Sequence, residues 1–184
     1  MHWGVVSCFP QRAAYYYLEI KLKPMGKIKA LFIRMRSALL VFLTHNMALP
    51  LLRIIRKPKV FPYSKAQLQQ FPQGTLGKDL VCFLEQKKLQ LLPHYAKHDI
   101  KHILLQYDTT DDGEVCLQCF MLGNRHLSFP VAATVLYGIV TMPEHWKKFV
   151  TAFRRGRRSL PIKGWKWFGI LDQPTASLIK KINQ

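Results

Sequence analysis

The sequence predicts an all-α protein with a single domain. Prolines and glycines divide the chain into segments whose apolar residues recur with helical spacing. No run alternates apolar and polar residues for long enough to require a β-strand. The chain has 184 residues, of which 49% are hydrophobic, so it can bury one substantial core but hardly two.

The segments with helical spacing are 27–56, 65–70, 75–90, 94–106, 112–124, 128–142, 143–155 and 174–182. Several of them begin with residues that favour helix starts. We expect Thr75 to be an N-cap, Pro143 and Pro174 to lie in first turns, and Asp111 and Glu114 to form a capping box.

Residues 1–24 are predicted to be an N-terminal extension, and residues 25–184 the single helical domain. The extension has no continuous apolar segment and no small-residue cleavage site, which argues against a signal peptide. A mitochondrial transit peptide is the alternative, since Glu19 is the only acid among the first 58 residues.

Two long apolar stretches bear on membrane association. Ser37–Leu52 has 16 residues without Asp, Glu, Lys or Arg, whereas a membrane span needs about 20. Basic residues flank this stretch, which predicts a helix that lies on a membrane surface. The second stretch, His126–Pro143, is either a wholly buried core helix or a membrane-facing one.

The net charge predicts an anionic partner. The chain has 28 Lys and Arg against 10 Asp and Glu, a formal charge of +18. Trp146–Trp167 contains eight basic residues, no acid and three of the four tryptophans. This composition favours an anionic membrane surface. The alternative is a solvated basic face with Trp146 in the core, and no nucleic-acid-binding motif is present.

The four cysteines are too sparse for a disulfide-stapled secreted scaffold, so a reducing compartment is expected. Cys116 and Cys119 have the spacing of a redox pair or of half a zinc ribbon. A second CxxC is missing, and the surrounding segment has helical spacing. We therefore expect these two thiols to fill the core as small hydrophobes.

Residues 94–114 stand out in this basic chain. They contain five of its ten acids and three of its seven histidines. On a helix, His98 and His102 are four residues apart and share a face, which Asp99 borders. Glu114 follows His102 after eleven intervening residues, and an antiparallel return would bring it back beside the first helix. We predict that these four residues bind a divalent metal, with zinc preferred and iron, manganese or magnesium as alternatives.

Each acid and histidine of this segment could also have a purely structural role. His94 is interpreted as a helix-start or surface histidine and is left out of the ligand set. Asp111, Asp112 and Glu114 could merely cap the second helix. A single histidine is more often an interfacial residue than a ligand. The combined pattern His-Asp-x-x-His-x11-Glu favours a metal site.

At these residues the sequence resembles the family of coenzyme Q (ubiquinone) biosynthesis protein 4. His98, Asp99, His102 and Glu114 match the metal-binding signature of that family. Phe71–Gly77 resembles its Pro-x-Gly-Thr-Leu-Gly element, and the resemblance extends over Pro62–Ile182. The chain departs from the family at Lys101, where many members have an aromatic residue, and at Gln106, where a glycine is usual.

The resemblance implies an all-α fold with a metal site between two antiparallel helices and an apolar groove for a polyprenyl lipid. It implies a metal-dependent oxidative decarboxylation, in which the ring carboxyl of a polyprenylated hydroxybenzoate is replaced by hydroxyl, or the organisation of the biosynthetic complex with other quinone-biosynthesis proteins. Helices 37–52 and 128–142 would then house the prenyl tail. The expected location is peripheral, at the cytoplasmic face of the membrane in a bacterium or at the matrix face of the mitochondrial inner membrane in a eukaryote.

Two further functions are compatible with the sequence. One is a non-catalytic prenyl-lipid-binding scaffold with a structural metal. The other is a metal-dependent phosphohydrolase, suggested by the His98–Asp99 pair. That class needs further ligands, and His126, His145 and Asp172 lack the expected spacing. The sequence leaves the oligomeric state open.

Overall fold

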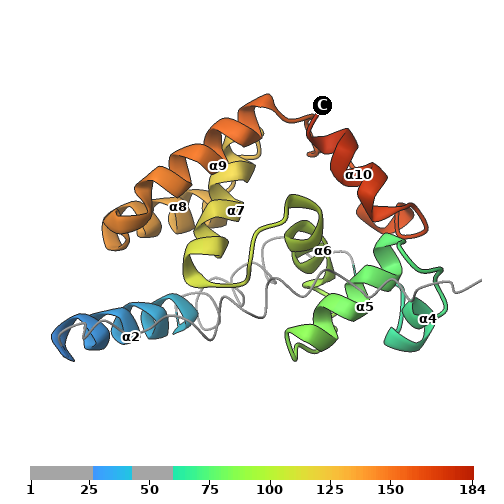
Figure 1. The fold of residues 1–184 in the computed structure, drawn as a ribbon, viewed down its shortest axis with the longest axis horizontal. Coiled ribbons are helices and arrows are strands. Elements are labelled where there is room, and N and C mark those ends of the chain that lie inside the picture. The colour runs from blue at the N-terminus through green and yellow to red at the C-terminus, as the bar shows by residue number, and fades with distance from the viewer. Residues whose placement is uncertain (1–26, 43–59) are drawn as a thin grey trace, which may run out of the picture.

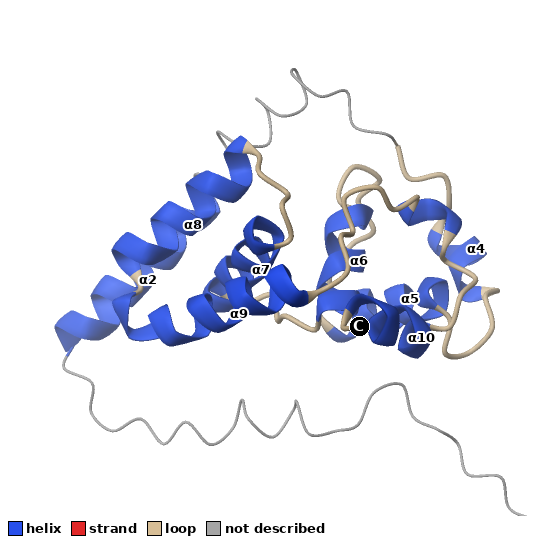
Figure 2. Cartoon of the chain, turned by 90° about the horizontal axis from the view of Figure 1, so that it is seen from above, coloured by secondary structure: helices blue, strands red, loops and turns tan. Residues whose placement is uncertain are grey.

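The computed structural model describes residues 27–42 and 60–184 (Figure 1). The predicted extension 1–24 and the second half of the predicted helix 27–56 lie outside these residues. Within them the chain forms α-helices and two short 3₁₀ helices, with one isolated β-bridge and no strand. Figure 2 shows the same all-helical composition, which confirms the predicted fold class.

The helices follow one another along the chain in this order: α2 (Lys27–Phe42), α4 (Lys65–Gln69), α5 (Leu76–Gln86), α6 (Ala96–Leu105), α7 (Asp111–Gly123), α8 (Phe129–Thr141), η2 (Pro143–His145), α9 (Trp146–Arg158), η3 (Trp167–Gly169) and α10 (Thr175–Ile182).

Three predicted helix ends need correction. The helix predicted over 75–90 is too long at its C-terminal end. The observed helix α5 ends at Gln86, because the chain turns there and Lys88 adopts a left-handed φ of 54°. Pro143 begins a 3₁₀ turn, and α9 starts only at Trp146. Pro174 is the N-cap of α10, one residue before its first turn. Thr75 is an N-cap as predicted, but its hydroxyl donates to the carbonyl of Pro72, 2.7 Å away.

The predicted capping box at Asp111 and Glu114 is wrong. Thr110 is the N-cap of α7, and its hydroxyl accepts a hydrogen bond from the Gly113 amide at 3.3 Å. The third position of the helix is then a glycine, which has no side chain to complete the box. Glu114 lies one residue further along and is left to form other contacts.

Helix α7 occupies the centre of the fold because it contributes to both hydrophobic clusters. Leu117, Phe120 and Met121 belong to a large cluster with residues of α4, α5, α6 and α10. Val115, Cys116 and Cys119 belong to a second cluster with residues of α8 and α9. Cys116 and Cys119 are buried free thiols, as expected for small core residues, and burial raises the pKa of Cys116 to about 11 and that of Cys119 to about 12.

Glycines allow α7 and α9 to approach closely. A Cβ on Gly123 of α7 would lie 2.2 Å from the carbonyl oxygen of Phe153, and one on Gly156 of α9 would lie 2.1 Å from that of Phe120. Real Cβ atoms do not come this close to backbone atoms. The two helices therefore pack backbone against backbone at this crossing.

Helix α8 is not the wholly buried helix that was one alternative. Only Val131, Val135 and Gly138 are buried within it. Large apolar side chains of α8, and of α2 beside it (Figure 2), are exposed: Phe129, Leu136, Ile139 and Val140 on α8, and Leu31, Phe32, Met35 and Leu39 on α2. We call these eight residues the apolar surface.

Polar contacts attach α2 to α8. The hydroxyl of Tyr137 donates to the carbonyl of Arg36 at 2.6 Å. The guanidinium of Arg36 donates to the carbonyl of Thr141 at 2.9 Å and pairs with Glu144 at 2.7 Å. None of the helices in the described ranges has the combined length and apolarity required to cross a membrane.

The tryptophans of the basic region have different environments. Trp146 is half exposed, so the alternative prediction that it lies in the core is wrong. Its indole N–H donates to the carbonyl of Ile139 at 2.8 Å. Trp167 is buried in the large cluster, where Lys97 and Lys101 of α6 lie over its ring. Lys101, one of the departures from the family pattern, therefore takes part in a cation–π contact.

Candidate metal centre

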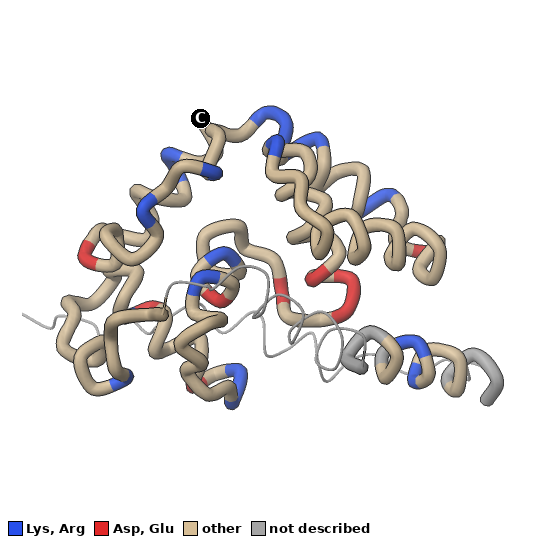
Figure 3. The backbone as a smooth tube through the Cα atoms, turned by 180° about the vertical axis from the view of Figure 1, so that it is seen from behind, with Lys and Arg blue, Asp and Glu red and all other residues tan. Residues whose placement is uncertain are grey.

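Helices α6 and α7 bring three predicted ligands together. His98 and His102 are one turn apart on α6, and Glu114 lies in the first turn of α7, after the connecting loop has reversed the chain. One ligand atom from each of these residues lies within 4.8 Å of the other two. Figure 3 shows acidic residues gathered at the start of α7, in a chain whose charged residues are mostly Lys and Arg.

The three side chains contact one another directly. The Nε2 atom of His102 lies 2.9 Å from Oε1 of Glu114 and 3.0 Å from Nε2 of His98. His98 Nε2 lies 3.2 Å from Oε2 of Glu114. The His102 side chain is 0% exposed, whereas those of His98 and Glu114 are 35% and 28% exposed. The cluster is therefore anchored in the core and accessible from one side.

The surroundings of His102 fix its orientation. Its Nδ1 lies 3.0 Å from the carbonyl oxygen of Tyr107, and Phe83 of α5 stacks on its ring with centroids 6.2 Å apart. A carbonyl oxygen can only accept a hydrogen bond, so Nδ1 carries the proton in this contact. The Nε2 atom then faces His98 and Glu114 with its lone pair when the imidazole is neutral. Such an outer contact is the usual way in which proteins orient a ligating histidine.

The cluster shifts the pKa values of its members. Burial alone would raise the pKa of Glu114, but hydrogen bonds and charges from His102 and His98 outweigh it and lower the pKa to about 2. Burial alone would lower the pKa of His102, yet Glu114 and the Tyr107 carbonyl outweigh it, so the pKa of His102 is raised. Glu114 is therefore ionised throughout the physiological pH range.

Asp99 is the fourth predicted ligand, and it lies beside this group rather than within it. Its carboxyl is buried, and burial raises its pKa; the charges of His98 and His102 oppose that shift, and the charge of Glu114 adds to it. Among residues 27–42 and 60–184, the group of ligand atoms within 4.8 Å consists of His98, His102 and Glu114. Coordination by Asp99 stays a prediction. His94 is exposed and outside the group, consistent with its omission from the ligand set.

The donor set fits a divalent first-row ion. Two imidazole nitrogens and a carboxylate oxygen are ligands that zinc, iron and manganese accept. In a tetrahedral site with bonds of about 2.0–2.1 Å, neighbouring donors lie about 3.3 Å apart. The closest donor pairs here are at 2.9, 3.0 and 3.2 Å, so movements of a few tenths of an ångström would accommodate an ion.

Sequence reasoning missed the residues that support the ligands. Tyr107 acts through its backbone carbonyl, and Phe83 belongs to another helix, so the spacing of residues gives no signal for either. For Gly113 the sequence gives a partial indication, because this glycine lies inside an acidic turn. A Cβ there would lie 2.2 Å from the carbonyl oxygen of Asp108, so glycine is needed where the loop folds back over the start of α7.

Fold and donor set together define an all-α protein with a candidate divalent-metal centre. Among solved structures, the chain is similar to the crystal structure of a protein from Nostoc punctiforme described as a "Putative ubiquinone biosynthesis protein". The identity is 20%, the match covers 87% of this chain and 83% of the other, and the TM-score is 0.55. At this identity the likeness shows a shared fold. No family model matches the chain, and no curated protein matches it.

Proposed function

We propose that the protein acts in ubiquinone biosynthesis as a metal-dependent enzyme that replaces the ring carboxyl of a polyprenylated hydroxybenzoate by hydroxyl. The observation that carries the proposal is the convergence of His98, His102 and Glu114 at the partly open end of a buried cluster. The fold shared with the Nostoc punctiforme protein, described as a "Putative ubiquinone biosynthesis protein", supports the pathway part of this proposal.

The three candidate ligand residues would hold the metal and leave one side of it accessible. The metal, when bound, supplies a Lewis acid that can polarise a carboxylate or phenolate oxygen. His102 is held by Tyr107 and Phe83, and Glu114 is ionised, so both are ready to bind a cation. His98 is the most exposed of the three and borders the side from which a substrate can approach.

Asp99 is the candidate proton carrier. Its buried carboxyl retains a proton more readily than an ordinary aspartate does, and it interacts with His98, His102 and Glu114. If Asp99 does not itself coordinate the ion, its carboxyl can hold or release a proton beside the three candidate ligands. The ring–carboxyl bond breaks as carbon dioxide leaves and a ring–oxygen bond forms, which is a two-electron oxidation. The reaction therefore also consumes an external co-reactant, either dioxygen or a two-electron acceptor with water as the oxygen source.

The apolar surface supports a lipid substrate. Exposed apolar side chains gathered on adjacent helices are unusual on a protein that meets only water. We propose that α2 and α8 contact the acyl region of an anionic membrane, where a prenyl tail resides. The net charge of +18 supports the same peripheral location, at the cytoplasmic face in a bacterium or the matrix face in a mitochondrion.

A turnover assay with the prenylated hydroxybenzoate tests the chemistry. The wild type is expected to release carbon dioxide and form the hydroxylated ring, and His98→Ala and Glu114→Ala are expected to lose the reaction while remaining folded. His94→Ala is the matched control, because His94 is exposed and lies outside the cluster. A metal-loaded wild type without turnover, but with bound prenyl lipid, would instead support the non-catalytic scaffold.

The phosphohydrolase alternative has less support. That class needs further histidine and aspartate ligands around the metal. Within the described part of the chain, neither His126, His145 nor Asp172 belongs to the ligand group.

A further inference from the structure

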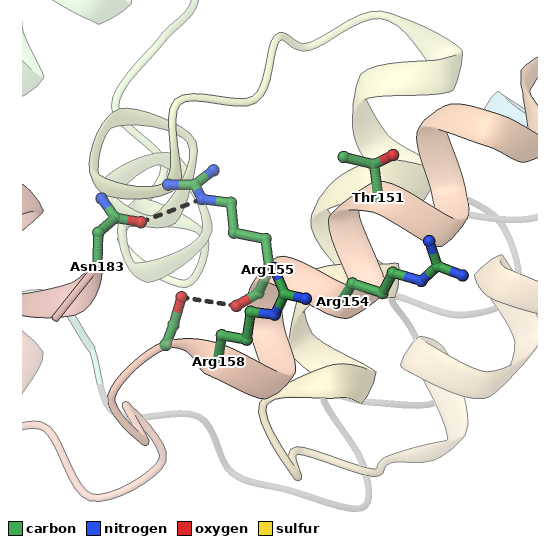
Figure 4. A pocket seen from close by; sticks show the side chains of 6 residues that line it. Thr151, Arg154, Arg155, Arg158 and Asn183 are labelled. Atoms are coloured by element: carbon green, nitrogen blue, oxygen red, sulfur yellow. Dashed lines mark hydrogen bonds between the residues drawn. The ribbon is translucent and has the colours of Figure 1, made fainter.

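A basic hollow lies where the C-terminal half of α9 meets the C-terminal end of α10 (Figure 4). It is an open depression of about 450 Å³. We call it the arginine hollow, and its lining residues are Thr151, Arg154, Arg155, Arg158, Ser159 and Asn183. All of the charged side chains in this lining are guanidinium groups, so the hollow offers several hydrogen-bond donors and a high positive charge.

Two of the lining arginines are exposed and have no carboxylate partner within the described part of the chain. Arg154 and Arg158 are exposed and one helical turn apart on α9, a spacing at which like charges repel. Within residues 27–42 and 60–184, neither forms an ion pair, whereas Arg36, Lys87 and Lys148 each pair with a carboxylate at 2.6–2.8 Å. The charge of this part of α9 is therefore left for a ligand to neutralise.

Arg155 forms a fixed wall of the hollow. Its Nε donates to Oδ1 of Asn183 at 3.1 Å, and its Nη1 donates to the carbonyl of Leu105 at 2.6 Å. Its guanidinium also lies over the rings of Tyr107 and Phe120, at 5.4 and 5.3 Å from their centroids. The Arg155 guanidinium is therefore already ordered in the free protein, so ligand binding loses no conformational entropy at this side chain.

The helix dipole does not explain the whole cluster. The C-terminal end of a helix favours cationic side chains, and Arg155, Arg157 and Arg158 lie in the last turn of α9. Arg154 lies before that turn, yet it lines the same hollow. Three arginines line this one depression, which is more than the dipole requires.

We propose that the arginine hollow binds a phosphate group, through Arg154 and Arg158 as exposed donors and Arg155 as the donor held by the fold. Guanidinium groups present paired N–H donors whose geometry matches two oxygens of a phosphate. The phosphate can belong to a lipid headgroup or to a small phosphate ester in solution. This site is separate from the metal centre and holds whether or not the proposed reaction is correct.

A double substitution tests the site in the full-length protein. Arg154→Gln with Arg158→Gln removes two exposed guanidinium groups that have no ion pair in the described part of the chain, so the melting temperature is expected to stay unchanged. Lys147→Gln with Lys163→Gln is the matched control, because it removes the same charge from exposed positions outside the hollow. Arg155 is left intact because it also supports the fold.

Binding is measured with two kinds of probe. Inorganic phosphate and glycerol 3-phosphate are titrated into the labelled protein by NMR, and flotation is measured with phosphatidylcholine vesicles with and without phosphatidic acid. The arginine variant is expected to lose about tenfold or more in affinity for at least one of these probes, and the lysine variant about twofold or less. Loss with the soluble phosphates identifies a small ligand, and loss with the vesicles alone identifies a headgroup.

Two results would overturn the proposal. Equal loss in the arginine and lysine variants would mean that net charge alone, rather than the hollow, attracts phosphate. Binding of an oligonucleotide that depends on Arg154 and Arg158, with no response to soluble phosphates or to vesicles, would reassign the hollow to nucleic acid.

Discussion

His102 is the residue on which the candidate site depends most, because it is buried and two contacts from outside its own helix restrain it. It is fully buried, Tyr107 accepts a hydrogen bond from its Nδ1, and Phe83 stacks on its ring. Its spacing from His98 identified it in the sequence, but neither restraint could be predicted. Both depend on tertiary contacts with parts of the chain that carry no metal-binding pattern.

Metal affinity is expected to fall steeply on acidification. A metal binds the neutral imidazole, and the raised pKa of His102 means that protons already compete above the ordinary titration range of histidine, near pH 6.5. Below the pKa of the folded protein, the apparent affinity should drop about tenfold per pH unit for each displaced proton. Competition with a chelating dye between pH 5.5 and 8 measures this, and a flat profile would contradict a histidine-bound metal.

Gln106 carries backbone strain at the end of α6. It is the C-cap in the left-handed conformation, with φ 59° and ψ 36°, at the position where the resembling family usually has glycine. Glycine adopts this conformation without a steric penalty, so this position favours glycine for a local reason that the sequence alone did not reveal.

Gln106→Gly is therefore expected to stabilise the protein by up to about 1 kcal/mol, because relief of strain outweighs the greater freedom of the unfolded chain. Gln118→Gly, within α7, is the contrasting control and should destabilise by about 1 kcal/mol. Thermal and denaturant unfolding compare the two variants. If Gln106→Gly instead destabilised the protein, the Gln106 side chain would have to stabilise the fold by more than the left-handed backbone conformation costs.

At the scale of helices, the start of α7 decides what Glu114 can do. Thr110 and Asp111 are both good N-cap residues in adjacent positions, so the sequence could not distinguish them. The structure uses Thr110, which shifts Glu114 out of the capping position and directs its carboxylate toward the histidines. A shift of one residue in the helix start thus separates a capping role from a ligand role.

The crossing of α7 and α9 gives a direct test of helix packing. Gly156→Ala would place a methyl group 2.1 Å from the carbonyl oxygen of Phe120, and only a separation of the two helices can relieve that contact. We expect a loss of about 1–3 kcal/mol in the free energy of unfolding. Gly164→Ala is the matched control, since nothing lies within 4 Å of its added Cβ. Equal stability of the two variants would refute this close packing.

On the scale of the whole molecule, the sequence predicted the helical class and nearly every helix, because proline, glycine and apolar spacing are local signals. It could not predict which apolar helix faces stay uncovered. The segment 126–143 is apolar on all sides, and such a pattern is shared by buried and lipid-facing helices. Only the packing of α7, α8 and α9 shows that Leu136 and Val140 face outward.

The apolar surface predicts a lipid contact that mutation can remove. Leu136 and Val140 are 64% and 70% exposed, so Leu136→Asp with Val140→Asp should leave the fold stable while reducing flotation with anionic vesicles several-fold. The matched control is Ala132→Asp with Ala133→Asp, which adds the same charge at exposed but small side chains of α8. Similar effects of both pairs would indicate a purely electrostatic attraction.

The net charge of +18 is distributed unevenly, and residues 94–114, which contain the candidate ligands, hold five of the ten acids. Figure 3 shows acidic residues gathered at the start of α7. The central claim is that His98, His102 and Glu114 bind one divalent ion. Elemental analysis of the purified wild type, of His102→Ala, of Glu114→Gln and of the His94→Ala control tests it most directly. We expect one ion per chain in the wild type and the control and a substoichiometric amount in the two ligand variants. Equal metal content in all four proteins, or none in a wild type supplied with metal, would contradict it.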